Sequence, residues 1–363
     1  MMKLRILVFL ACCSYAAWSE KMPEREHVLK VMERVADWQI ENPHPRESKK
    51  PLAWTSATWY AGLFEFAQMK DDPKYIEYLR GIGSEHQWGM NPWAPYHADN
   101  HCIGQMYLEM FRTYAEPDMK MKIQERFDWI LEHRATTGLV AEKGNSSRWN
   151  WCDALFMAPP VWAKMYAVTG NEDYLRFMDE EFRSTTAYLY DPEAHLYFRD
   201  SNFFGKKSKN GEKVFWSRGN GWVFGGLTLV MRELPEDSAL RPFYEKIFKE
   251  MAAALKPLQG DDGFWRASLL DPDEIPEPES SGTAFFTYGF AWGINNGLLD
   301  RSEYLSAVSN GWKALESAVH ANGKMGWVQQ IGHDPRPTSA DETQVYGVGA
   351  FLFAGSEILK LME

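Results

Sequence analysis

The segment RWNWCDALFMAPPVW (148–162) carries the clearest chemical signal in the sequence. Asp153 stands at the start of an apolar helical pattern, directly after Trp149 and Trp151. Capping of the helix is one common reason for Asp at such a position. Apolar rings around a carboxyl group disfavour its charged form, which keeps an acid protonated near neutral pH. We therefore predict that Asp153 is a proton donor and that Trp151 lies beside it.

A second carboxylate stands in PYHADNHCIGQMYLEMF (95–111), where Asp99 also comes just before a helical pattern. His97, Asp99 and His101 alternate as metal ligands sometimes do, but three residues within five positions and no distant partner make a poor metal site. Helix capping by Asp99, with the histidines as polar loop residues, is the plain alternative. We predict that Asp99 shares a pocket with Asp153, with one group charged and the other protonated, and that no metal is bound.

A third motif, VFWSRGNGWVFGGL (214–227), places Trp216, Arg218 and Trp222 around a predicted Gly-rich turn that enters a helix. Arg clamps a carboxylate through two parallel hydrogen bonds, and Trp faces stack on sugar rings. A surface cation–π pair is the alternative. His195, in AHLYFRD, is a further candidate for substrate binding. The sequence lacks the spacing of a phosphate-binding loop and the G-x-S-x-G element of a serine hydrolase.

Helical periodicity extends over most of the chain and must position these residues. Apolar residues recur at helical spacing in eleven segments, which are 27–40, 57–69, 101–114, 121–133, 154–168, 173–188, 221–233, 241–255, 284–298, 302–318 and 346–361. Polar turns before aromatic-bearing helix starts repeat along the chain, and their spacing predicts six helical hairpins. Six hairpins can close into a ring, the all-α (α/α)6 barrel, whereas an open solenoid is the alternative. Long loops rich in Trp, Gly, His and Asp at 88–100, 142–153, 191–221 and 333–344 would then meet at one rim as a cleft.

Composition and the N-terminus limit the class of protein. The formal net charge of −11 argues against nucleic acid or an anionic membrane as a partner, although a local Arg can still bind an acidic substrate. Residues 1–19 resemble a signal peptide, with Lys3 and Arg5 before a short apolar run and a cleavage site ahead of Glu20. A lipoprotein anchor at Cys12 or Cys13 is the weaker alternative, and no later segment is apolar enough to span a membrane.

The mature chain, residues 20–363, contains no composition break that would mark a second domain. We therefore expect one catalytic domain in an exported, periplasmic or secreted protein. Cys102 and Cys152 are too few for a disulfide framework, and we expect free buried thiols rather than a pair. The sequence carries no signal for an oligomeric state.

The motifs WCDALFMAPPVWAKMYAVTGNEDYL, FWSRGNGWVFGGL, SSGTAFFTYGFAWGINNGLL and YGVGAFLFAGSEI resemble the unsaturated rhamnogalacturonyl hydrolases of glycoside hydrolase family 105, which are related to the unsaturated glucuronyl hydrolases of family 88. The resemblance runs from about residue 25 to the C-terminus. It implies an (α/α)6 barrel without a metal or other cofactor. It also implies removal of a 4,5-unsaturated galacturonyl or glucuronyl unit from the non-reducing end of an oligosaccharide that a polysaccharide lyase has produced.

The implied mechanism differs from ordinary glycoside hydrolysis, in which two carboxylates flank the glycosidic bond. In the family an acid protonates C4 of the vinyl ether, water adds at C5, and the hemiketal opens and expels the aglycone. The resemblance assigns acid and then base to Asp153, a supporting carboxylate to Asp99, and uronate binding to Arg218, Trp216, Trp222 and His195. An inverting glycosidase, a polysaccharide lyase or a catalytically silent sugar-binding relative on the same barrel are the alternatives.

Overall fold

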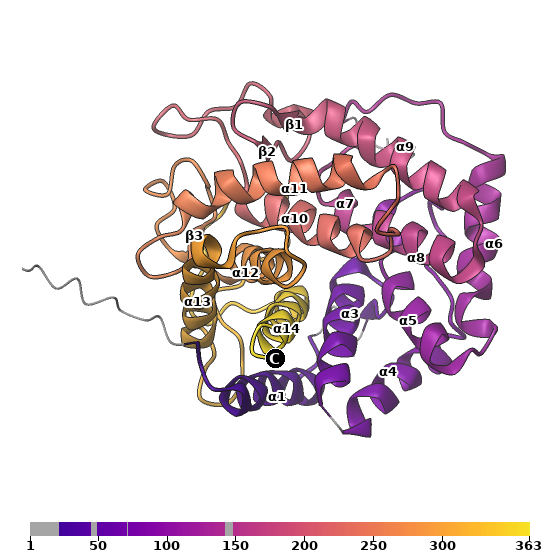
Figure 1. The fold of residues 1–363 in the computed structure, drawn as a ribbon, viewed down its shortest axis with the longest axis horizontal. Helices are drawn as coiled ribbons and strands as arrows, with labels where there is room; N and C mark the ends of the chain where they lie inside the picture. Colours follow the sequence, from indigo (N-terminus) through magenta and orange to yellow (C-terminus); the bar gives the residue numbers. More distant parts are fainter. Residues whose placement is uncertain (1–21, 45–48, 71, 142–147) are drawn as a thin grey trace, which may run out of the picture.

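The computed structural model describes residues 22–44, 49–70, 72–141 and 148–363, and helices make up most of this part of the chain. Outer helices alternate along the chain with inner ones (Figure 1). The outer helices are α1 (Arg25–Glu41), α4 (Pro73–Glu85), α6 (Asp118–Glu132), α9 (Glu172–Leu189), α11 (Arg241–Leu255) and α13 (Arg301–Ser317). The inner helices are α3 (Trp54–Met69), α5 (Gly104–Tyr114), α8 (Pro159–Thr169), α10 (Ser217–Met231), α12 (Ser280–Asn295) and α14 (Val345–Lys360).

Short elements fill the connections between these helices. Three of them are single 3-10 turns, η1 (Ala98–Asn100), η2 (Ser201–Phe203) and η3 (Lys256–Leu258). Strands β1 (Tyr190–Asp191) and β2 (Leu196–Tyr197) pair antiparallel, with Tyr190 opposite Tyr197. Strands β3 (Trp265–Arg266) and β4 (Pro278–Glu279) form a second antiparallel pair, with Trp265 opposite Glu279. The larger of these connections, around β1 and β2, leads into α10.

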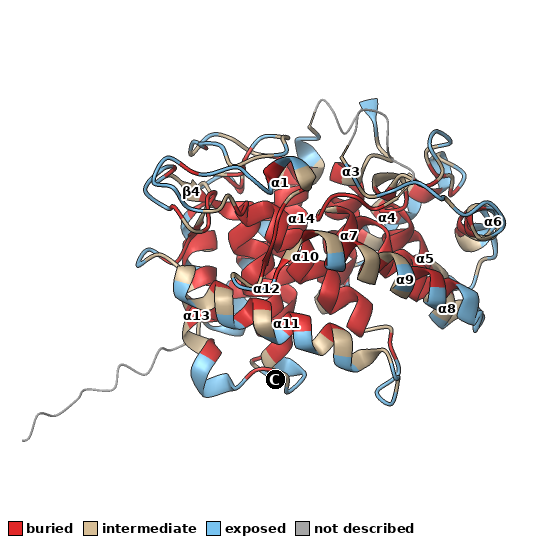
Figure 2. Cartoon of the chain, turned by 90° about the horizontal axis from the view of Figure 1, so that it is seen from above, coloured by how far each residue is buried: buried red, intermediate tan, exposed pale blue. Residues whose placement is uncertain are grey.

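The inner helices form a closed ring. Each one contacts the next, from α3 through α5, α8, α10 and α12 to α14, and α14 packs against α3. The inner helices are buried nearly all round, whereas α1 buries only a stripe that includes Val28, Met32 and Val35 (Figure 2). This arrangement confirms the predicted (α/α)6 barrel. The alternative of an open solenoid is wrong, because the last inner helix closes on the first.

Two glycines allow this closure between α3 and α14. A Cβ atom on Gly62 would overlap the carbonyl oxygen of Gly349, and one on Gly349 would overlap the carbonyl oxygen of Thr58. The two backbones therefore approach more closely than side chains would permit. Any larger residue at either position would have to push the helices apart.

Two predicted elements differ from the structure. The helix predicted at 154–168 is wrong as a single element, because it breaks at Ala158 into α7 (Ala154–Met157) and α8. Pro159 begins α8 at a position where a missing N–H is tolerated. The Gly-rich turn predicted at RGNG is also wrong, because these residues form the first turn of α10. Asn220 fixes that turn by exchanging hydrogen bonds of 2.8 and 3.0 Å with the backbone of Tyr197.

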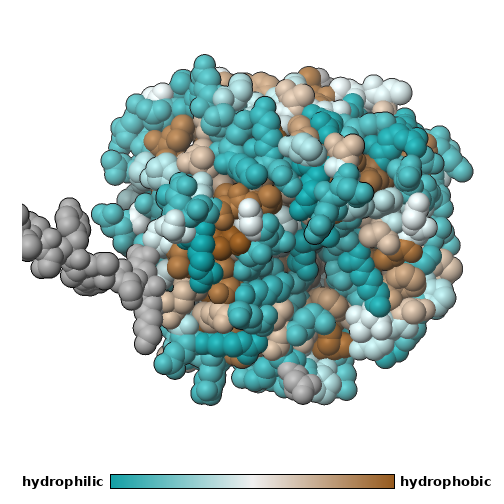
Figure 3. Space-filling view, in the orientation of Figure 1, coloured by the Kyte–Doolittle hydropathy of each residue, from teal (hydrophilic) through white to brown (hydrophobic). Residues whose placement is uncertain are grey.

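The two ends of the ring differ in chemistry. Each inner helix is the second of its hairpin, so the inner helices run parallel and begin at the same end, where the long connections gather (Figure 2). At the other end, Lys164 of α8 pairs with Glu109 and, at 2.8 Å, with Glu233, and Arg112 also pairs with Glu233. Hydrophilic side chains cover most of the face at which α14 ends (Figure 3). No helix in the described ranges is long and apolar enough to cross a membrane.

Candidate active site

Asp153 occupies the N-cap position of α7, yet its side chain makes no capping hydrogen bond. The Asp153 side chain is 13% exposed, and two neighbouring side chains lie close to its Oδ2 atom. The Cys152 thiol donates to Oδ2 at 3.4 Å, and Arg199 Nε lies 3.7 Å from the same atom. Burial, helped by the Asp153 charge, raises the pKa of Cys152 well above its usual range, so the sulfur keeps its proton. The carboxylate is therefore available for chemistry rather than for capping.

Arg199 is the residue in this group that the sequence analysis missed. Its carbonyl oxygen accepts the Cys152 backbone N–H at 2.8 Å, which fixes the loop after β2 against the start of α7. Its guanidinium also pairs with Asp200. Burial alone would lower the pKa of Arg199, but Asp153 and Asp200 outweigh it and raise that pKa. The loop thus brings a permanent positive charge to the Asp153 carboxylate.

Asp99 lies on the neighbouring segment. Its 3-10 turn, η1, packs against α7, and the His97 ring lies 5.0 Å from the Trp151 ring. His97 Nδ1 accepts the Asp99 backbone N–H at 3.3 Å and lies 3.9 Å from Asp99 Oδ2. The structure therefore brings the segments of both predicted carboxylates together. Trp151 contacts the Asp99 segment through the His97 ring, whereas Trp149 packs on Phe177.

His101 is a structural histidine. The Trp162 indole N–H donates to its Nδ1 at 3.3 Å, so the proton of the neutral ring is on Nε2, which donates to the Pro95 carbonyl oxygen at 2.7 Å. Burial lowers the pKa of His101 to about 3, which keeps the ring neutral. Both ring nitrogens are thus engaged within the protein. Across the described ranges, no group of three or more His, Cys, Asp or Glu could hold a metal ion.

Arg218 lies in the first turn of α10 and is buried. Its Nη1 donates to the carbonyl oxygens of Gln329 and Gln330 at 2.9 and 3.1 Å and to the Tyr346 hydroxyl, and its Nη2 donates to the Gly332 carbonyl oxygen at 3.1 Å. The Trp216 ring supports the guanidinium at 4.2 Å. Arg218 Nε is buried and has no hydrogen-bond partner. The guanidinium therefore fixes the loop at 329–332 and keeps one unused donor.

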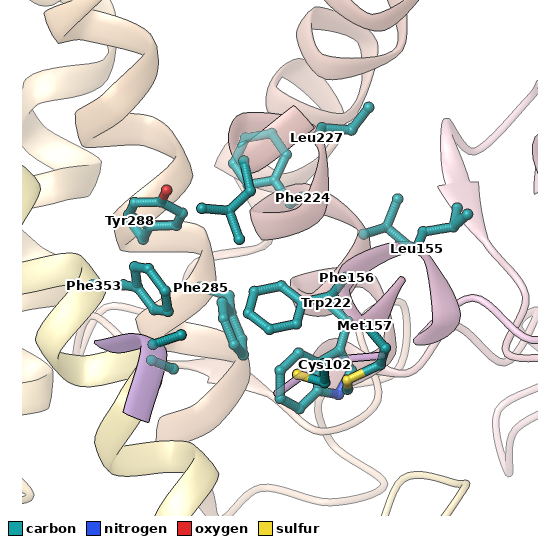
Figure 4. Close-up of a cluster of buried hydrophobic side chains, with 14 of the residues drawn as sticks. Cys102, Leu155, Phe156, Met157, Trp222, Phe224, Leu227, Phe285, Tyr288 and Phe353 are labelled. Atoms are coloured by element: carbon teal, nitrogen blue, oxygen red, sulfur yellow. The ribbon is translucent and has the colours of Figure 1, made fainter. Parts of the chain in front are cut away.

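Trp222 follows one helical turn after Arg218 and is fully buried. Its ring packs between Phe156 and Phe285, with centroid distances of 4.8 and 4.5 Å (Figure 4). Its indole Nε1 also lacks a partner. Direct contact of Arg218, Trp216 and Trp222 with a uronate stays a prediction. The structure shows these three side chains enclosed by protein, with two unused donors one turn apart.

Gly219 joins the two groups of residues. A Cβ atom at this position would lie 3.1 Å from Cys152 Sγ and 3.1 Å from Trp216 Cε3. The first turn of α10 is thus in close contact with the residue before Asp153. The Asp153 group and the Arg218 group consequently border one another at the end of the ring where the inner helices begin.

His195 lies apart from both groups. Its Nδ1 is 2.9 Å from the Tyr190 hydroxyl, which donates to Glu250 of the outer helix α11 at 2.7 Å. His195 is the last residue of the turn between β1 and β2, and its backbone has a φ of 54°. Nothing in this geometry brings its ring to Asp153, and its predicted role in uronate binding stays a prediction. The Cys102 and Cys152 thiols are buried and unpaired, which confirms the expectation of free thiols.

The site can therefore transfer a proton to or from an acidic ligand. It combines a carboxylate that is free of capping, a neighbouring cation, a nearby second carboxylate segment and unused buried donors on α10. A general acid needs such a positioned carboxyl group within reach of the reacting atom. Arg218 Nε and Trp222 Nε1 are buried N–H donors without a partner, and such donors are costly unless a ligand or water satisfies them.

Comparisons with known proteins agree with this chemistry. The sequence profile described as Glycosyl Hydrolase Family 88 matches residues 23–362. A relative named unsaturated 3S-rhamnoglycuronyl hydrolase, from Formosa agariphila, is 39% identical over the full length of both chains. The solved structure of a family 88 glycosyl hydrolase from Bacteroides vulgatus is 30% identical, with a TM-score of 0.84 over 93% of this chain and 99% of that chain.

Another solved structure, of a protein described as a polysaccharide lyase, is 31% identical, with a TM-score of 0.83 over 93% of this chain and 98% of that chain. The profile match covers almost the whole described chain, and the barrel agrees with it. These findings confirm the predicted relationship to families 88 and 105. The chain belongs to glycosyl hydrolase family 88 and is a glycoside hydrolase.

Proposed function

We propose that this protein removes a 4,5-unsaturated uronic acid from the non-reducing end of oligosaccharides that a polysaccharide lyase has produced. The observation that carries the proposal is Asp153, which stands at a helix start without capping it, while Arg199 at 3.7 Å stabilises the carboxylate that forms once the proton has been given up. A relative that is 39% identical over its full length is named an unsaturated 3S-rhamnoglycuronyl hydrolase. Unsaturated uronides attached to rhamnose are therefore the substrates to test first.

In the proposed reaction Asp153, as the carboxylic acid, gives its proton to C4 of the sugar, and C5 takes up positive charge. Water attacks C5 and returns a proton to the Asp153 carboxylate, which makes a hemiketal. The hemiketal opens to a C5 ketone and an unstable hemiacetal at C1, which releases the aglycone as an alcohol. One water is consumed and the acid is regenerated. Asp99 supports the site from the neighbouring segment η1.

The uronate carboxylate is held by the unused donors in this proposal. Arg218 Nε and Trp222 Nε1 lack partners and lie one helical turn apart at the start of α10. Arg199, 25% exposed, supplies a positive charge beside Asp153. Charge-assisted hydrogen bonds to Arg suit a planar carboxylate, which supports this placement.

The test is the ultraviolet absorbance of the C4=C5 bond during incubation with unsaturated disaccharides. The panel contains unsaturated uronic acid linked to rhamnose with and without a sulfate ester, to glucose and to an amino sugar. A hydrolase removes the absorbance, and the fastest member of the panel defines the neighbouring sugar. The lyase alternative, which has a described lyase among the similar structures, predicts a rise in absorbance from the intact polysaccharide instead. No loss of absorbance on any member would refute the proposal.

We further propose that the protein is exported, on the basis of residues 1–19, which lie outside the described residues. Mass spectrometry of the mature protein checks this expectation. A chain that begins at Glu20 supports cleavage by signal peptidase, a lipid on Cys12 or Cys13 supports an anchor, and an intact Met1 contradicts export.

A further inference from the structure

A cavity outside the Asp153 and Arg218 groups lies between the outer helix α6 and the loop that precedes η1. Its volume is about 460 Å³. The residues that line it are Gly89, Met90, Pro92, Pro95, Lys122, Glu125, Arg126 and Trp129. We call it the α6 pocket. Nothing in the proposed reaction uses these residues, although their loop continues to His97 and Asp99.

Arg126 is the unusual residue of the α6 pocket. Its Nη2 donates to the Asn91 carbonyl oxygen at 2.6 Å, but its Nη1 is buried and has no hydrogen-bond partner. Within the described part of the chain, no carboxylate forms an ion pair with it. Burial lowers the pKa of Arg126 to about 10, as expected for a cation without a compensating charge. An oxyanion in the pocket would supply the missing countercharge.

The rest of the α6 pocket has the character of a sugar site. Trp129 is 43% exposed even though His133 stacks on it at a centroid distance of 4.5 Å and an interplanar angle of 13°. Lys122 lies two helical turns before Trp129 and adds a second positive charge, against the single negative charge of Glu125. Met90 and the two prolines give an apolar wall. An exposed indole beside cationic groups suits a pyranose ring that carries an anionic substituent.

We propose that the α6 pocket binds an anionic sugar unit, a uronate or a sulfate ester, of the polysaccharide whose fragments the enzyme degrades. This choice of ligand rests on the proposed function. The role proposed for the pocket is binding alone. It would hold the enzyme on acidic chains while the catalytic site processes their ends.

The test is calorimetric titration of the Asp153→Asn variant, which holds the catalytic site inactive. The ligands are a saturated oligouronide, the same chain with sulfate esters, and a neutral oligosaccharide of equal length. We expect binding of the uronide or the sulfated chain, or of both, to a site that Arg126→Gln weakens roughly tenfold or more. Binding of one acidic ligand alone identifies carboxylate or sulfate as the group recognised. Equal binding of the neutral chain overturns the proposal.

Further variants separate binding from folding, because Arg126 also holds Asn91. Lys122→Gln and Trp129→Ala alter the pocket without touching that hydrogen bond, and both should weaken the same binding event. Lys120→Gln, on the same helix but outside the pocket, is the matched control and should leave it unchanged. Unchanged affinity in Arg126→Gln, Lys122→Gln and Trp129→Ala overturns the proposal. Loss of C4=C5 absorbance by the wild type is measured separately, so failure of this site and failure of the proposed function remain distinguishable.

Discussion

Replacement of Arg199 by Met should impair catalysis without unfolding the barrel. Arg199 Nε lies 3.7 Å from Asp153 Oδ2, with the two side chains 25% and 13% exposed. Two unit charges about 4 Å apart interact by about 4 kcal/mol at an effective dielectric constant of ~20. Water around this partly exposed pair weakens the interaction between the two charges. We therefore expect a loss of about 2–3 kcal/mol of transition-state stabilisation, which lowers kcat/KM roughly 30- to 150-fold.

The assay follows loss of the C4=C5 absorbance by wild type, Arg199→Met and Arg199→Lys, with thermal unfolding measured in parallel. Arg199→Lys keeps the positive charge and should recover part of the rate, because the predicted loss comes from the charge interaction with Asp153. Arg134→Met is the matched control, since it removes an exposed ion pair with Glu180 on an outer helix. Wild-type kcat/KM in Arg199→Met, or an equal fall in the Arg134→Met control, would refute the reasoning.

Two further predictions concern the contact beside Asp153 and the charged end of the ring. Gly219→Ala should lower kcat/KM by roughly threefold to tenfold, because its Cβ would press on Cys152 at 3.1 Å, and the double variant with Cys152→Ala should regain part of the rate. Unchanged kinetics in the single variant would contradict this. Burial alone would raise the pKa of Glu233, but Lys164 and Arg112 lower it to about 2. The group therefore stabilises the fold by up to about 3 kcal/mol above pH ~4.5, and this is lost as the pH falls towards 2. The free energy of unfolding of Glu233→Gln, measured with denaturant, should change less between pH 4.5 and pH 2 than that of the wild type. An equal change with pH in both proteins would contradict the assignment.

The fold was predictable because helical periodicity is a local property that repeats along the chain. The break at Ala158 was not, since the periodicity of 154–168 continues across Pro159 and conceals the change of direction. The Gly-rich start of α10 looked like a turn, but Asn220 and its contacts with Tyr197 hold it helical. Such contacts join segments that are distant in sequence, and no spacing rule reveals them.

The sequence pointed to the carboxylates of the candidate site, but it revealed less about the residues that surround them. Asp153 could be singled out because an acid at the head of an apolar helix is conspicuous. Arg199 was not predicted, because its importance comes from its contact with Asp153, which joins two different loops. Trp216 and Trp222 were expected to present their faces to a sugar, yet both rings are buried. Trp216 supports Arg218, and the Trp222 ring packs on Phe156 and Phe285, so that only its indole N–H is left as a donor. The residue types indicated an aromatic site, but they could not show which Trp side chains contact a ligand and which only support other residues.

The most direct test of the central claim compares two substrates that differ only in the C4=C5 bond. The proposed mechanism begins with protonation of C4 by Asp153, so a saturated uronide on the same neighbouring sugar lacks the C4=C5 bond on which the reaction depends. We predict that the wild type cleaves the unsaturated substrate with loss of absorbance, leaves the saturated one intact, and loses turnover by orders of magnitude in Asp153→Asn while still binding substrate. Cleavage of both substrates at similar rates, or near-normal turnover by Asp153→Asn, would contradict the account.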